Sequence, residues 1–130
     1  MIYIGIGSNL GNKVYNIEKA KSYLIMNNVN ILKSSSYYET SSWPDPRKPK
    51  FYNIVVQSDC NFSPKKLIKI FQSIEKLLGR KQKPKNSPRK CDIDLISYNN
   101  KFYKGDISIP HIRMHQRNFV LIPNTFVWIK

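Results

Sequence analysis

Two aspartates stand two positions apart in the stretch SPRKCDIDLISY (87–98), in a chain with only eight acidic residues against 22 lysines and arginines. In a β-strand, alternate side chains share a face and two residues advance the chain by roughly 6.6 Å. Asp92 and Asp94 can therefore approach common ions. Magnesium takes oxygen ligands, commonly one or two carboxylates together with substrate phosphates. The spacing predicts a magnesium–phosphate site, and the alternative of a solvated strand face is less favoured because aspartate is depleted in strands.

A run of basic residues precedes this pair. Six cations fall within residues 80–90: Arg80, Lys81, Lys83, Lys85, Arg89 and Lys90. Taken alone, such a run indicates a solvated loop. Beside two metal-binding carboxylates it indicates a polyphosphate ligand, because a metal bridges some phosphate oxygens and basic side chains neutralise the others.

Two histidines, His111 and His115, form an HxxxH pattern near Arg113 and Arg117. Zinc is not favoured there, because no helical HExxH and no suitably spaced cysteines accompany the pair. We interpret these residues as a basic edge in which a histidine donates to a phosphate oxygen.

The glycine-rich stretch GIGSNLG (5–11) has two readings. It resembles a dinucleotide-binding fingerprint, but its third glycine is one place late, and a Rossmann domain needs parallel βαβ units. The favoured reading is a tight strand-to-helix turn that requires glycine dihedral angles. The sequence contains no GxxxxGK[ST] phosphate loop.

Hydrophobic patterning predicts the elements that position these residues. We expect strands at 2–8, 29–40, 51–60 and 91–98, and a proline-rich loop at 41–50. A first helix over 12–27 has Asn12 as its cap and an apolar face of Val14, Ile17, Ala20 or Lys21, and Leu24. A second helix runs from the Ser63 cap and Pro64 to Gly79, with an apolar stripe of Leu67, Phe71, Ile74 and Leu78.

The order strand, helix, strand, strand, helix, strand predicts an α+β fold of the ferredoxin-like βαββαβ type. Its sheet is mostly antiparallel, with helices packed on it. The 130 residues predict a single domain over 1–130. Cys60 and Cys91 form no disulfide framework, which indicates a reducing cytoplasm, and no apolar run reaches the roughly 20 residues of a membrane helix. The net charge of +14 favours anionic ligands, although part of it fits a general drift toward lysine, asparagine and isoleucine.

Five motifs occur in an order typical of one family: YIGIGSNLGN, FYNIVV, IEKLLGR, PRKCDIDLI and IPHIRMHQRNFVL. Together they span residues 2 to about 123, and the chain resembles the 6-hydroxymethyl-7,8-dihydropterin pyrophosphokinase (HPPK) family of folate biosynthesis. The resemblance implies a ferredoxin-like fold. It also implies transfer of pyrophosphate from ATP to the pterin hydroxymethyl group, with release of AMP, by a cytoplasmic monomer that uses two magnesium ions.

The resemblance also implies roles for individual residues. Catalytic roles fall on Arg80, Arg89, Asp92 and Asp94, with both aspartates as magnesium ligands. ATP-binding roles fall on Gln72, Glu75, Lys83, Lys85, Arg89, Leu95, Ser108, His111 and Arg117. Pterin-binding roles fall on Thr40, Ser41, Trp43, Phe51, Asn53, Asp92 and Phe119. From its position beside Ile74, Glu75 can also be read as a solvated helix charge.

Two other readings stay open at this point. Ferredoxin-like sheets with aromatic and basic residues can bind single-stranded RNA, but the aromatic-rich motif of such modules is missing and two aspartates would repel a phosphate backbone. We therefore expect small-molecule substrates, no nucleic acid and no membrane. The other reading is a homologue that binds pterin without catalysis, because Asn86 stands near the place of the family's usual loop tryptophan.

Overall fold

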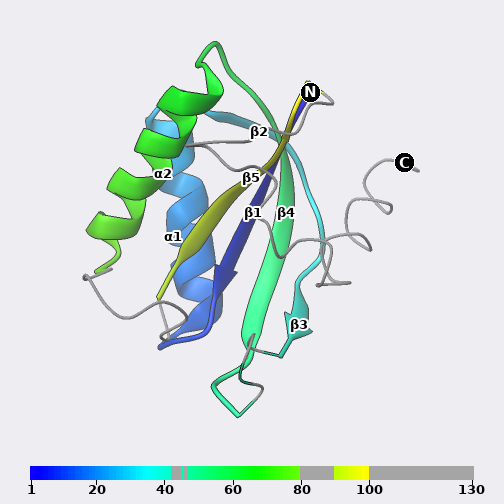
Figure 1. Cartoon of the computed structure of the whole chain (residues 1–130), viewed down its shortest axis with the longest axis vertical. Helices are drawn as coiled ribbons and strands as arrows, with labels where there is room; N and C mark the ends of the chain where they lie inside the picture. Colours follow the sequence, from blue (N-terminus) through cyan, green and yellow to red (C-terminus); the bar gives the residue numbers. More distant parts are fainter. Residues whose placement is uncertain (42–44, 46, 80–89, 100–130) are drawn as a thin grey trace.

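The computed structural model describes residues 1–41, 45, 47–79 and 90–99 of the chain (Figure 1). This part forms five strands and two helices. In chain order they are β1 Ile2–Ser8, α1 Lys13–Met26, β2 Asn30–Ser34, β3 Tyr38–Thr40, β4 Phe51–Asp59, α2 Pro64–Leu77 and β5 Asp92–Tyr98.

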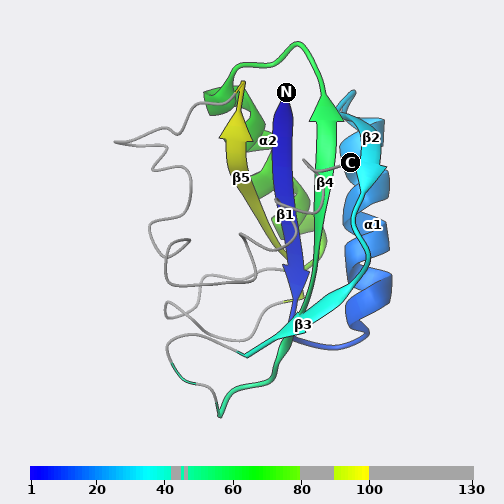
Figure 2. The same cartoon turned by 90° about the vertical axis from the view of Figure 1, so that its right-hand side faces the viewer.

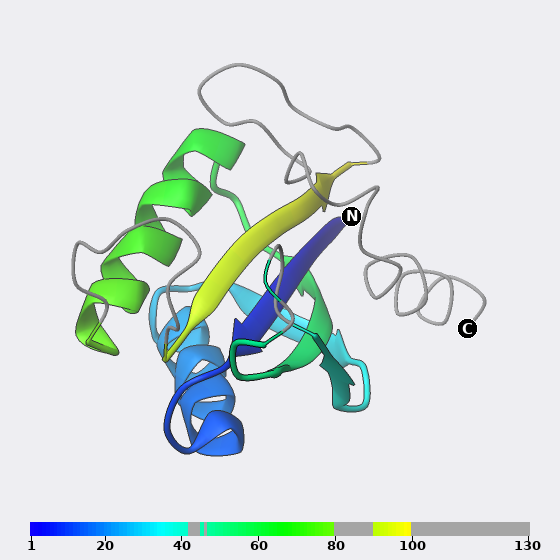
Figure 3. The same cartoon turned by 60° about the horizontal axis from the view of Figure 1, so that its bottom comes forward.

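The strands form one antiparallel sheet in the order β2-β4-β1-β5, and the short β3 pairs with the beginning of β4. Both helices pack on one face of this sheet (Figures 1, 2 and 3). A sheet whose central strand β1 lies between β4 and β5, with helices after the first and before the last strand, is the split βαβ arrangement. The predicted α+β, ferredoxin-like fold is confirmed. Neither described helix is long and apolar enough to span a bilayer.

The predicted strand at 29–40 is wrong in one respect, because it divides into β2 and β3. Between them, the chain follows β4 through Ser35, whose backbone N–H donates to the Val55 carbonyl and whose Oγ accepts from the Val55 N–H, both at 2.9 Å. A serine side chain thus replaces part of the ladder. Serine commonly offers the backbone such alternative hydrogen bonds, which explains the break within SSS at 34–36.

Helix α1 begins at the predicted cap, since Asn12 Oδ1 accepts from the Tyr15 N–H at 3.0 Å. The prediction that Val14 lies on the apolar face is wrong, because its side chain is exposed. Asn16 is buried in the first turns instead, and its Nδ2 donates to the Leu10 carbonyl at 2.9 Å. This polar contact ties α1 to the loop that follows β1.

Helix α2 has the predicted boundaries. Ser63 Oγ accepts from the Lys66 N–H at 3.2 Å, Pro64 occupies the first helical position, and Gly79 follows the last turn at φ +90°. A left-handed residue at this place is the usual helix ending, and glycine adopts it without strain. The buried face contains the predicted Leu67, Phe71 and Ile74, together with Ile70 and Glu75, whereas Leu78 is only partly buried.

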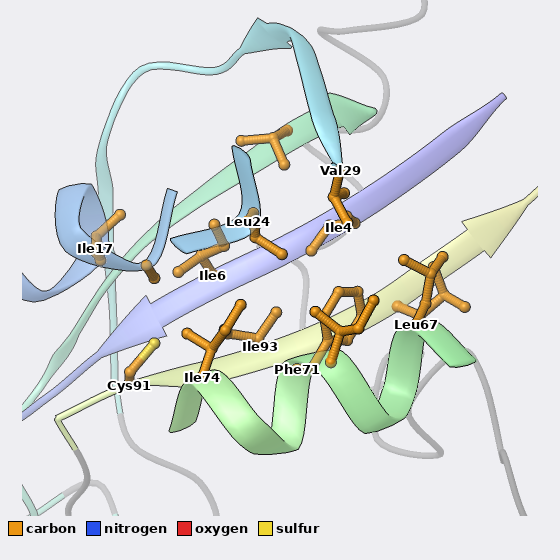
Figure 4. Close-up of a cluster of buried hydrophobic side chains, with 14 of the residues drawn as sticks. Ile4, Ile6, Ile17, Leu24, Val29, Leu67, Phe71, Ile74, Cys91 and Ile93 are labelled. Carbon is orange, nitrogen blue, oxygen red and sulfur yellow. The ribbon is translucent and has the colours of Figure 1, made fainter. Parts of the chain in front are cut away.

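The core fills the space between the helices and the sheet, with side chains from both layers meeting there (Figure 4). In β1 the isoleucines at positions 2, 4 and 6 point into this core. Cys91 is buried in it and Cys60 packs partly against it, both as free thiols. Because strand side chains alternate, Gly5 and Gly7 of β1 belong to the opposite face of the sheet.

Ser63→Ala is expected to lower the free energy of unfolding by about 1 kcal/mol, because the Lys66 N–H loses its capping partner. Urea unfolding followed by circular dichroism measures the change. Ser73→Ala, an exposed substitution in the middle of the same helix, is the matched control and should be neutral or slightly stabilising. Equal losses in the two variants would show that the cap contributes nothing specific.

Candidate active site

The candidate site lies on the face of the sheet opposite the helices, which we call the second face. Gly7 of β1 pairs with Asn53 of β4 on one side and with Asp92 of β5 on the other. Gly5 pairs in the same way with Val55 and Asp94. Directly paired residues of antiparallel strands point to the same face. The second face therefore brings Asn53 and both aspartates together across a strand that carries only glycine between them.

Asp92 and Asp94 are half-buried, whereas Ile93 and Leu95 between and beyond them are buried in the core. The prediction that both carboxylates share a strand face is thus consistent with the burial pattern of β5. Their partners in β1, Gly7 and Gly5, have no side chains, and the Asn53 and Phe51 side chains lie over Gly7 while the Ile96 side chain lies over Gly5. Neighbouring strands lie about 4.8 Å apart, so the backbone at Asn53 and at Asp92 is separated by roughly 10 Å.

Gly7 is a position at which only glycine fits without movement. A Cβ added there would lie 2.9 Å from Asn53 Oδ1 and 3.4 Å from Phe51 Cδ1. The Asn53 carboxamide therefore lies directly on the β1 backbone, with the Phe51 ring beside it. A glycine inside a strand commonly marks such a close approach.

Asn53 is held in one orientation, with only 6% of its surface exposed. Its Nδ2 donates to Thr40 Oγ1 at 2.9 Å, and it has longer contacts of 3.4 Å to the carbonyl oxygens of Tyr38 and Phe51. These contacts direct the amide donors toward β3. Among the described residues, no donor to Asn53 Oδ1 is found.

Two aromatic residues flank this carboxamide at the end of the sheet where β3 joins β4 (Figure 2). Phe51 and Tyr38 are both half-buried. Asn53, Gly7 and Asp92 are paired across β4, β1 and β5 and form one row on the second face. Burial raises the pKa of the Tyr38 phenol, so its hydroxyl stays neutral and adds no charge to this row. A neutral, partly aromatic wall beside a fixed amide suits a flat heterocycle.

Glu75 is not a solvated helix charge, and that reading is wrong. Only 6% of its surface is exposed, and its Oε2 accepts from the Ile93 N–H at 2.9 Å. Ile93 stands between the two aspartates. A carboxylate from α2 thus reaches the backbone of the strand that presents the candidate metal ligands.

The remaining predicted residues in the described part lie elsewhere. Gln72 is exposed on α2, in the helix layer, and Ser41 is exposed just after β3. The Leu95 side chain is fully buried in the core, so it cannot contact a nucleotide on the second face except through its backbone. The other predicted site residues lie outside the described residues: Trp43, Arg80, Lys83, Lys85, Arg89, Ser108, His111, Arg117 and Phe119.

Sequence reasoning missed the role of Gly7. Its signal is the alternation IGIG, with isoleucine on one face of β1 and glycine on the other. In a buried central strand, that alternation indicates a face that something must approach closely. The partner that approaches, Asn53, is visible only from the pairing of β1 with β4.

The second face has the donor set that magnesium prefers. Within the described residues, no group of three or more His, Cys, Asp or Glu side chains converges as a closed metal site. Two carboxylates on one face of a strand instead suit an ion that keeps waters and takes its other ligands from substrate phosphates. The residues present therefore fit magnesium carried in with a nucleotide.

Thr40→Val is expected to weaken binding of the pterin that the sequence resemblance implies about fivefold, because the Asn53 amide loses its closest acceptor, a net hydrogen bond of about 1 kcal/mol. Titration of the pterin by its intrinsic fluorescence measures the dissociation constant. Thr40→Ser retains the hydroxyl and should bind almost normally. Equal affinities for the valine and serine variants would mean that Thr40 does not orient Asn53.

Fold and site together define a class of protein: a ferredoxin-like α+β domain whose sheet presents, on one face, a carboxylate pair suited to divalent cations and a fixed carboxamide. The chain belongs to the 7,8-dihydro-6-hydroxymethylpterin-pyrophosphokinase (HPPK) family, whose model matches residues 3–128. The predicted family is confirmed.

The chain matches relatives of about its own length and relatives that are several times longer. The "2-amino-4-hydroxy-6-hydroxymethyldihydropteridine pyrophosphokinase" of Haemophilus influenzae is 32% identical, over 93% of this chain and 77% of that protein. The protein of the same name from Aquifex aeolicus is 31% identical, over 94% of this chain and 76% of its own length. The "Folic acid synthesis protein fol1" of Pneumocystis carinii is 36% identical over 94% of this chain, which spans only 17% of that longer protein.

Proposed function

We propose that this chain transfers pyrophosphate from ATP to 6-hydroxymethyl-7,8-dihydropterin and releases AMP. The observation that carries the proposal is the pairing of Gly7 with both Asn53 and Asp92, which places a fixed carboxamide and a carboxylate pair on the same face of the sheet. The names of the bacterial relatives describe the same pyrophosphokinase activity. The family match over residues 3–128 supports a single pyrophosphokinase domain over 1–130.

Magnesium would be held by Asp92 and Asp94 together with the oxygens of the ATP triphosphate, and we propose two ions. When bound, magnesium supplies positive charge that neutralises the phosphate oxygens and fixes their shape. The half-buried position of both carboxylates supports this role, because partial burial strengthens their attraction for a cation.

The pterin would lie beside the Asn53 carboxamide, with an N–H group of its ring donating to Asn53 Oδ1. Thr40 holds the amide in the orientation that presents this oxygen. Phe51 would cover one side of the ring, since its own ring lies beside the same glycine. From this position the pterin side chain can extend along the row toward Asp92, roughly 10 Å away across two strand spacings.

In the reaction, the pterin hydroxyl oxygen forms a bond to the β-phosphorus and the bond from that phosphorus to the oxygen bridging to the α-phosphate breaks. AMP leaves with the electron pair of the broken bond, and the hydroxyl proton passes to solvent. Phosphoryl transfer of this kind depends mainly on positioning and charge stabilisation. The chain's part is therefore to align the two substrates, with Arg80, Arg89, Lys83 and Lys85 proposed as the cations that hold the phosphates.

We further propose that the protein works as a monomer in the reducing cytoplasm on these two small substrates, without nucleic acid or membrane. The free thiols Cys60 and Cys91 support a reducing compartment.

The decisive experiment is identification of the adenine nucleotide formed from magnesium, ATP and the reduced pterin alcohol. AMP formed in step with the pterin diphosphate is the expected result. ADP would instead indicate transfer of a single phosphoryl group. Pterin binding without any nucleotide product would favour a homologue that has lost catalysis, and RNA binding that falls steeply with salt would favour the nucleic-acid reading.

A further inference from the structure

Glu75 is a charged residue on the buried face of an otherwise apolar helix stripe. Its neighbours on that face are Leu67, Ile70, Phe71 and Ile74. Removing a carboxylate from water costs several kcal/mol unless hydrogen bonds compensate. An apolar residue would pack there without that cost, so the position indicates a requirement other than core stability.

The carboxylate reaches the strand β5 near its N-terminal end. Its Oε2 accepts from the Ile93 N–H at 2.9 Å, inside the protein. Ile93 pairs with Ile6 of β1, and β5 lies at the end of the strand order β2-β4-β1-β5. The Ile93 N–H that donates to Glu75 is directed away from β1. Glu75 therefore supplies the hydrogen-bond acceptor for this N–H at the outer edge of β5, where no described strand pairs with β5.

The two aspartates flank this anchored residue on either side. Because Asp92 and Asp94 point to the second face while Ile93 points to the core, the peptide units around Ile93 set the direction of both carboxylates. A hydrogen bond to a charged acceptor contributes more to stability than a ladder bond between neutral groups. Fixing this peptide therefore fixes how far apart the two carboxylates stand.

We propose that Glu75 is a positioning residue: it holds the backbone between Asp92 and Asp94 so that the two carboxylates bind divalent cations together. This inference rests on the proposed function, since it assumes that the aspartates are the cation ligands. Glu75 touches neither substrate in this account and acts through Ile93. Partners of this kind around metal ligands typically change metal affinity by about 10–100-fold when lost.

The test measures manganese binding by electron paramagnetic resonance of the free ion, in the presence of a non-hydrolysable ATP analogue. Three substitutions of Glu75 test separately the length of the side chain, its negative charge and its apolar packing. Glu75→Asp keeps the charge but is too short to reach Ile93, Glu75→Gln keeps an acceptor oxygen without charge, and Glu75→Leu removes both. We expect the dissociation constant to rise about 10–100-fold for the aspartate and leucine variants and only about threefold for the glutamine variant.

Ile70→Ala is the control for a purely structural effect. Ile70 is buried on the same helix, so its truncation should lower the melting temperature through lost packing. Manganese affinity should stay unchanged in this variant. If Glu75→Leu does not fold, the Glu75→Asp variant decides the question on its own.

Asp94→Asn separates failure of this inference from failure of the proposed function. If Asp94→Asn weakens manganese binding but Glu75→Asp does not, the positioning role is wrong and the proposed function stands. If Asp94→Asn leaves manganese affinity unchanged, the aspartates are not cation ligands, and the positioning role fails with them.

Discussion

Asp94→Asn is expected to lower kcat about 10³-fold while the protein remains folded. The substitution keeps the size of the side chain but removes the charge that, with Asp92, would hold the cations on the triphosphate. Losing about 4 kcal/mol of charge stabilisation in the transition state corresponds to three factors of ten in rate. Single-turnover measurement of AMP release at saturating pterin and ATP gives the change.

Asp59→Asn is the matched control for this substitution. Asp59 ends β4, is exposed, and lies outside the row that contains Asp92 and Asn53. Its replacement should leave kcat within about twofold, as is usual for surface positions. A similar loss in both variants would point to a general effect of net charge, and normal turnover by Asp94→Asn would remove this residue from the mechanism.

Gly7→Ala is expected to weaken pterin binding about 100-fold, which corresponds to about 2.8 kcal/mol. The added Cβ would lie 2.9 Å from Asn53 Oδ1, closer than real Cβ contacts allow. Because Thr40 Oγ1 holds the other end of that amide, Asn53 must leave its orientation and lose the acceptor position proposed for the pterin. Fluorescence titration with the pterin, in the presence of an ATP analogue, measures the loss.

The companion substitution Gly5→Ala lies on the same strand and face. There the added Cβ meets Ile96 Cδ1 at 3.2 Å, the far end of a flexible side chain that can move. Pterin affinity should therefore remain within about threefold of the unsubstituted protein. Equal effects of the two alanines would show that the loss comes from the strand backbone rather than from the Asn53 pocket.

The fold could be predicted from sequence because its signals are local. The caps at Asn12 and Ser63, the helix ending at Gly79 and the alternation in β1 each depend on a few neighbouring residues. Once the order of elements was known, the antiparallel split βαβ sheet followed from general connection rules.

The errors concern helix residues whose burial depends on contacts outside their own helix. Periodicity assigned Val14 to the core and left Glu75 in solvent, since it ranks residues by their own hydrophobicity. The structure buries Asn16 because Leu10 supplies an acceptor, and it buries Glu75 because Ile93, 18 residues further on, supplies a donor. Such contacts are set by the packing of helix on sheet, which no local pattern contains.

The candidate site was predictable only in part for the same reason. Strand alternation alone places Asp92 and Asp94 on one face, and the structure agrees. The position of Asn53 opposite Gly7, and of Gly7 opposite Asp92, depends on the register of three strands. A shift of one residue in this register would move every side chain of a strand to the other face. The proximity of Asn53 to the two aspartates could therefore be established only from the structure.

Paramagnetic relaxation of bound pterin by manganese tests the central claim, that one sheet face holds the cations and the pterin side by side. With manganese and a non-hydrolysable ATP analogue bound, the hydroxymethyl protons of the pterin should be strongly broadened, since the row from Asn53 to Asp92 spans roughly 10 Å. The doubly substituted Asp92→Asn, Asp94→Asn protein should lose this broadening. A pterin that stays bound to the unsubstituted protein with sharp, unrelaxed resonances at saturating manganese would contradict the account.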